Sequence, residues 1–202
     1  MRKALFGLTL LFFTLSWPHY AFSYGYAEAE DEMVIIFREG LIAVSEGKWD
    51  LAQKKSKEGI SAQKGHLFEV DKLRPEFNAA IEKKDTSKTA ELFANLVYIS
   101  IREKLYRCMR DGLKDFKNNK ARLGLARKSY LDALDGNVKK QDPKKSEAIL
   151  KQFDIALEAV GNPGLFGVGA RQADPEGFKQ AVNNIDEQIM LSFPRFFQGN
   201  AT

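Results

Sequence analysis

Hydrophobic residues recur at three- and four-residue spacing along almost the whole chain, which is the period of an α-helix. The pattern is clearest in residues 31–46, and Gly47 then interrupts it. No stretch alternates between apolar and polar residues in the way that a half-buried strand requires. The sequence therefore predicts an all-α fold, a helical bundle of about six to seven helices with an N-terminal helical hairpin.

The predicted hairpin is centred on EGKWDLA, residues 46–52. Gly47 suits a tight turn, Trp49 can fill the angle between two helices, and Ala52 allows them to approach closely. This spacing is typical of one tetratricopeptide-type unit, but a repeat array needs at least about three copies. We therefore expect a single local hairpin, whose second helix runs from Trp49 toward Val70.

Further along the chain, Asp, Gly and Pro mark the expected helix ends. A break before Pro75 follows from the restricted geometry of a residue that precedes proline. The longest helix should lie at the centre of the fold, and two later helices should open with Asp-Pro. The expected helices cover residues 75–83, 85–117 and 120–134, followed by two that begin at Asp142-Pro143 and Asp174-Pro175.

The first 23 residues have the pattern of a secretory signal peptide. Arg2 and Lys3 precede an uncharged apolar run, residues 4–17, and Ala21-Phe22-Ser23 offers a cleavage site. We expect cleavage to leave a single helical domain, residues 24–202, without a transmembrane span, in the periplasm or outside the cell. A retained N-terminal anchor is the alternative.

Loss of residues 1–23 would lower the formal charge from +4 to +2. Basic residues are interleaved with acidic ones, so the sequence predicts no nucleic-acid binding. The single cysteine, Cys108, cannot form an internal disulfide. It lies in an apolar-periodic stretch, which favours a buried and unreactive thiol.

Counting residues excludes several kinds of metal and cofactor site. Covalent haem needs Cys-x-x-Cys-His, and di-iron bundles need two Glu-x-x-His motifs. Without His19, which lies in the predicted signal peptide, only His66 remains. No nucleophile motif accompanies it, so we expect a protein that is not an enzyme.

His66 and Glu69 are the strongest candidates for a metal site. On a helix they would share one face, and imidazole with carboxylate suits an iron or zinc ion. Glu39 and Glu103, which border apolar stripes, are the candidate additional ligands. The alternative is a solvated His/Glu pair on a lysine-rich helix.

The segment Gly65-His66-Leu67-Phe68-Glu69 resembles the His-x-x-Glu motif of imelysin-type proteins. The hairpin EGKWDLAQKKSKEG is similar to helical periplasmic domains attached to bacterial iron permeases. Both resemblances imply binding or delivery of a transition metal, iron first, without catalysis. They also imply His66 and Glu69 as the metal ligands.

Two other functions stay open. A non-covalent haem would use His66 with Met33, Met109 or Met190. A scaffold or accessory subunit of a cell-envelope complex would bind a partner protein through Leu165 and Phe166 of the apolar 161–174 loop, or through an aromatic tail, Phe193, Phe196 and Phe197. We expect the loop to pack against the bundle; the alternative is a loop exposed for a partner. The aromatic tail can equally close the bundle.

Overall fold

The computed structural model describes residues 30–63, 65 and 67–199 and confirms the all-α class. The predicted signal peptide lies outside these residues. Within them are eight α-helices and one 3-10 helix: α1 (Glu32–Ser45), α2 (Trp49–Ala62), η1 (Val70–Leu73), α3 (Arg74–Glu82), α4 (Thr86–Arg110), α5 (Phe116–Ala133), α6 (Asp135–Gln141), α7 (Pro143–Ala159) and α8 (Pro175–Ser192).

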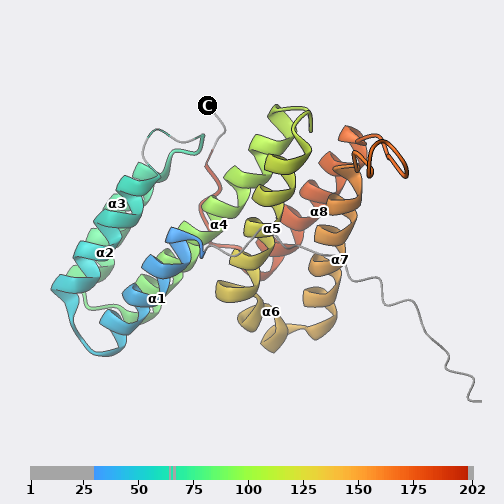
Figure 1. The fold of residues 1–202 in the computed structure, drawn as a ribbon. Helices are drawn as coiled ribbons and strands as arrows, with labels where there is room; N and C mark the ends of the chain where they lie inside the picture. Colours follow the sequence, from blue (N-terminus) through green and yellow to red (C-terminus); the bar gives the residue numbers. More distant parts are fainter. Residues whose placement is uncertain (1–29, 64, 66, 200–202) are drawn as a thin grey trace, which may run out of the picture.

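The long helix α4 lies at the centre of the bundle, as its length and apolar stripe predict. It contacts α1, α2 and α3 on one side and α5 and α8 on the other (Figure 1). Its middle turns are buried almost all round, with Phe93, Val97 and Ile99 fully enclosed. A helix that is apolar on every face requires partners on every face, so α4 joins the two halves of the fold into one core.

The N-terminal hairpin is confirmed as α1 and α2, joined by a turn in which Gly47 has φ +69°. Two other glycines let helices approach closely. A Cβ on Gly40 would lie 2.5 Å from the Phe93 ring, and one on Gly59 would lie 2.8 Å from Leu96 Cδ1. The hairpin therefore packs onto α4 through positions where only hydrogen fits.

Several helix boundaries differ from the predicted ones. The helix α2 ends at Ala62 and does not continue to Val70. The helix α4 ends at Arg110, because Gly112 and Leu113 adopt positive φ and Asp115 caps α5 by accepting a hydrogen bond from the Asn118 amide. A further short helix, α6, begins at Asp135, where we expected an end.

The Asp-Pro signals are confirmed as helix starts. Asp142 accepts hydrogen bonds from the amides of Lys144 and Lys145 at the start of α7, and Asp174 accepts one from the Gly177 amide at the start of α8. Side-chain caps of this kind satisfy amides that have no partner within the helix.

Among the described residues, no helix combines the length and low charge needed to cross a bilayer.

Cys108 is fully buried, as predicted, and burial raises the pKa of its thiol to about 12.

Candidate functional site

The predicted metal motif begins where α2 has already ended. His66 lies outside the described residues, while Leu67, Phe68 and Glu69 form a loop that leads into η1. The expectation that Glu69 lies on a continuing helix is therefore wrong. The pairing of His66 with Glu69 stays a prediction drawn from the motif.

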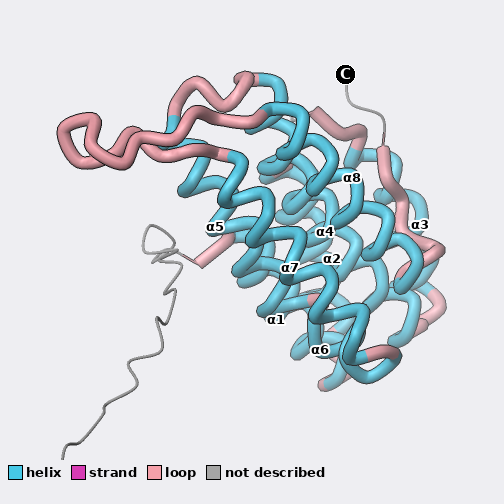
Figure 2. The backbone as a smooth tube through the Cα atoms, turned by 90° about the vertical axis from the view of Figure 1, so that its right-hand side faces the viewer, coloured by secondary structure: helices cyan, strands magenta, loops and turns pink. Residues whose placement is uncertain are grey.

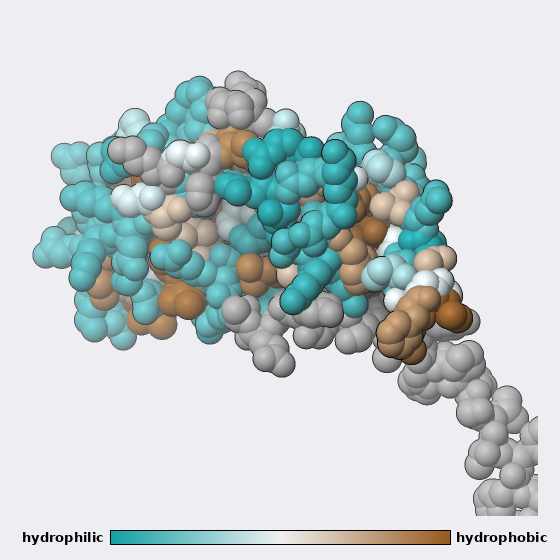
Figure 3. Space-filling view, turned by 45° about the horizontal axis from the view of Figure 1, so that its top comes forward, coloured by the Kyte–Doolittle hydropathy of each residue, from teal (hydrophilic) through white to brown (hydrophobic). Residues whose placement is uncertain are grey.

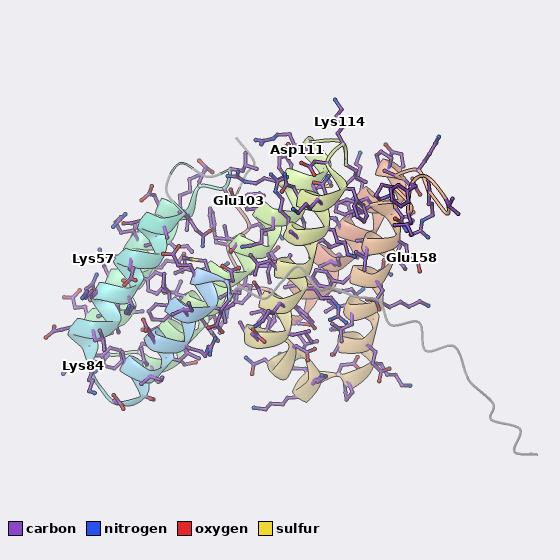
Figure 4. All side chains as sticks on the ribbon, viewed as in Figure 1. Lys57, Lys84, Glu103, Asp111, Lys114 and Glu158 are labelled. Atoms are coloured by element: carbon purple, nitrogen blue, oxygen red, sulfur yellow. The ribbon has the colours of Figure 1, made fainter. Side chains whose placement is uncertain are left out.

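The three candidate glutamates each lie beside a different cation. Glu69 lies 2.7 Å from Lys72 Nζ, Glu39 on α1 lies 2.5 Å from Lys55 Nζ, and the buried Glu103 on α4 lies 2.6 Å from Arg107 Nη2. Figure 4 shows Glu103 in the middle of the molecule, away from Lys84 in the turn between α3 and α4. In the part of the chain that the structure describes, no three His, Cys, Asp or Glu side chains converge on a common ion.

Glu103 also lines a cavity of about 360 Å³ beside a buried polar cluster. Asp31, the cap of α1, accepts hydrogen bonds from Ser129 Oγ at 2.7 Å and Ser100 Oγ at 3.3 Å. Lys104 Nζ lies 2.7 Å from the same carboxylate and also donates to Ser100 Oγ. Three helices, α1, α4 and α5, therefore meet at one carboxylate.

The electrostatics of this cluster favour an ionised Asp31. Burial raises the pKa of Asp31, but the Lys104 charge and the hydrogen bonds from Lys104, Ser129 and the Met33 amide lower it more, so the pKa lies below its ordinary value. Lys104 Nζ thus contacts both Asp31 and Ser100. The cluster is a structural junction between helices.

A second cavity, of about 290 Å³, lies between α4 and α8. Its walls are mainly apolar, formed by Ile101 and Leu105 of α4 and by Val182, Ile185 and Ile189 of α8. Aromatic rings complete it: Tyr98 and Tyr106 from α4, and Phe68 from the loop after α2. Cavities with such walls and a few polar groups are the usual form of small-molecule sites.

Three polar side chains of this cavity, Tyr98, Arg102 and Asp186, bind one another. Tyr98 Oη donates a hydrogen bond of 2.6 Å to Asp186 Oδ1, and Arg102 Nε lies 3.0 Å from the same oxygen. The Arg102 guanidinium also lies 4.5 Å from the centre of the Phe68 ring. Burial, together with the Asp186 charge and hydrogen bond, raises the pKa of Tyr98 above its ordinary value. Tyr98 is therefore a neutral hydrogen-bond donor.

The aromatic tail closes the bundle beside this cavity. Phe196 is buried, 5.5 Å from the Tyr98 ring centre, and Phe193 stacks on it at 4.6 Å. Asn95 exchanges two hydrogen bonds with the backbone of Phe197, and Arg102 donates to the carbonyl of Gln198. Phe196 is thus part of the core, and Phe193 and Phe197 pack against it, so the tail closes the bundle. Because its ring is enclosed, nothing supports contact of Phe196 with a partner protein.

The 161–174 loop, in contrast to the tail, exposes its apolar side chains to solvent. Leu165, Phe166 and Val168 are 76%, 97% and 80% exposed, so our expectation that they pack against the bundle is wrong. The loop projects past the ends of the helices (Figure 2), at the same end of the bundle as the α4–α5 turn. Figure 3 shows hydrophobic residues gathered at the right-hand edge of the molecule, where this loop lies in Figure 1.

Backbone hydrogen bonds join the two sides of this loop. Asn162 and Arg171 exchange two bonds of 2.8 and 2.7 Å, and nearer the tip Leu165 and Val168 exchange two of 3.1 and 3.0 Å. A Cβ on Gly164 would lie 2.5 Å from the carbonyl oxygen of Val168. The loop is therefore a hydrogen-bonded hairpin that holds its own shape.

Comparison of the chain with protein-family models, curated protein sequences and solved structures found no match. The resemblance to imelysin-type and iron-permease-associated domains accordingly stays a prediction from the quoted motifs. Sequence reasoning missed Tyr98, Arg102 and Asp186, whose only signal was that polar side chains interrupt the apolar stripes of two long helices.

Proposed function

We propose that this protein is a non-catalytic interaction subunit of the bacterial cell envelope, which binds a partner protein through the tip of the 161–174 loop. The observation that carries the proposal is Phe166, which is 97% exposed at the tip of a hydrogen-bonded hairpin. Leu165 and Val168 flank it and are nearly as exposed. Scattered apolar residues on a surface need no explanation, but three together on one projection favour a binding surface.

The order of the loop strengthens the proposal. A loop that is already shaped before binding loses less conformational freedom in the complex than a flexible segment does. Aromatic side chains are enriched in the buried centres of protein interfaces, and Phe166 would enter a pocket of the partner. Because the sequence predicts export, we expect that partner in the cell envelope.

The test is site-specific photo-crosslinking in cells that produce the full chain. A photoreactive residue at position 166 should give a discrete adduct, whereas one at Lys57, exposed on α2 and far from the loop (Figure 4), should not. Leu165→Asp should weaken the adduct, and Ile42→Asp, which alters another exposed apolar residue, should leave it unchanged. Equal crosslinking from positions 166 and 57 would contradict the proposal.

A metal titration separates this function from the predicted iron or zinc binding. An interaction subunit should give the same response to iron, zinc and copper before and after His66→Ala. A stoichiometric metal ion that is lost in the His66→Ala variant would support the metal hypothesis instead.

A further inference from the structure

The cavity between α4 and α8 combines apolar walls with an exposed cation at its edge. Ile101, Val182, Ile185 and Ile189 contribute apolar surface, and each of them is at most 6% exposed. Removing water from such walls is favourable in proportion to the apolar area covered. Its volume of about 290 Å³ is near the lower end of the range for ligand pockets. At about 30 Å³ for each water-sized group, it can hold roughly ten such groups.

The charges that line the cavity differ in how well they are neutralised. Arg102 and Asp186 form an ion pair of 3.0 Å, and Tyr98 donates its hydroxyl to the same carboxylate. Lys179 also lines the cavity, is exposed, and has no ion-pair partner among the described residues. The lining therefore carries one excess positive charge, which is at Lys179.

We propose that this cavity binds a small amphipathic monocarboxylate, with its hydrocarbon body between α4 and α8 and its carboxylate beside Lys179. A single cation complements a monoanion, whereas an ammonium head group would face a like charge. The hydrocarbon body would lie against Phe68 and Tyr106, whose rings form the aromatic wall. This site is separate from the 161–174 loop, so it does not depend on the proposed function.

Three ligands with the same hydrocarbon chain test the head-group preference: octanoate, 1-octanol and octylamine. Each is titrated into the full chain, with binding followed by amide chemical shifts. Octanoate should bind saturably and perturb amides of α4 and α8. Because an exposed ion pair contributes modestly, octanoate should bind about three- to fivefold more tightly than octanol. Octylamine should bind more weakly than either.

Two variants locate the site. Lys179→Gln should reduce octanoate affinity about three- to fivefold and leave octanol affinity unchanged, because only the ion pair is lost. Lys140→Gln, which removes an exposed lysine of α6, is the matched control and should change neither. Val182→Phe should fill the cavity and abolish binding of both octanoate and octanol.

The proposal is overturned by any of three results: no saturable octanoate binding up to millimolar concentration, octylamine binding as tightly as octanoate, or octanoate binding that survives Val182→Phe in a folded variant. If Val182→Phe does not fold, the test of the site is Lys179→Gln, because a change to an exposed side chain should leave the fold intact. An equal loss of octanoate affinity in Lys179→Gln and Lys140→Gln would then refute the site.

Discussion

Lys104 of α4 lies 2.7 Å from the carboxylate of Asp31, which caps α1 and also accepts a hydrogen bond from Ser129 of α5. These two contacts hold the start of α1 against α4 and α5, which lie much later in the chain. Because Asp31 is only 7% exposed, its charge depends on these partners.

Removing the charge of Asp31 should be costly near neutral pH. We expect Asp31→Asn to lower the free energy of unfolding by about 3 kcal/mol at pH 7, because it leaves Lys104 without its counter-ion. Asp132→Asn, which breaks the exposed Lys128 pair of α5, is the control and should cost less than about 0.5 kcal/mol. Urea unfolding of the two variants measures both values.

The stability that the Asp31 carboxylate contributes should depend on pH. The pKa of Asp31 is lower in the folded chain than its ordinary value, so its stabilisation is complete above that ordinary value, about 4. It is lost as the pH falls through the lower, folded pKa. The stability difference between wild type and Asp31→Asn should therefore shrink in acid. A difference that stays constant down to about pH 2 would contradict this account.

Asn95 should anchor the C-terminal tail. Its side chain donates to the Phe197 carbonyl at 2.9 Å and accepts from the Phe197 amide at 2.7 Å. We expect Asn95→Ala to lower the free energy of unfolding by about 2 kcal/mol and to make residues 193–199 more sensitive to proteases, since both bonds are lost. Limited proteolysis with mass spectrometry detects this change. Asn184→Ala, which loses a single partly buried bond to Gln152, should leave the tail protected.

Replacing Gly40 by alanine should lower the stability of the protein, whereas replacing Gly136 should not. A Cβ on Gly40 would overlap the buried Phe93 ring, so Gly40→Ala should cost about 1–3 kcal/mol. Nothing lies within 4 Å of a Cβ on Gly136 in α6, so Gly136→Ala should be neutral or stabilising by up to about 1 kcal/mol. Thermal unfolding of both variants checks the pair. Equal melting temperatures would show that α1 and α4 do not pack as described.

Cys108 should be inert in the folded protein. It is fully buried, and burial raises its pKa to about 12, so little thiolate is present at neutral pH. A thiol reagent should label the chain only at the rate of unfolding, and labelling should become rapid in guanidinium chloride. Rapid labelling without denaturant would contradict the described burial.

Local sequence signals were sufficient for most of the secondary structure. The turn at Gly47 and the caps at Asp85, Asp142 and Asp174 lie where the sequence predicts them, because a cap or a positive φ depends on a few neighbouring residues. The same signals were less reliable after Ala62 and near Asp135. After Ala62 the apolar period continues in the sequence although the helix ends. At Asp135, where we expected an end, a new helix begins.

The sequence by itself determined the helical class, the hairpin and the burial of Cys108, since periodicity and capping act over one or two helical turns. Only the tertiary structure decided which side chains meet. Asp31 and Ser129 are 98 positions apart, and Tyr98 and Asp186 are 88 apart, so no local pattern predicts their contact. The exposure of Phe166 and the burial of Phe196 were likewise decided by packing, because an apolar side chain in a connecting segment can lie in the core or in solvent.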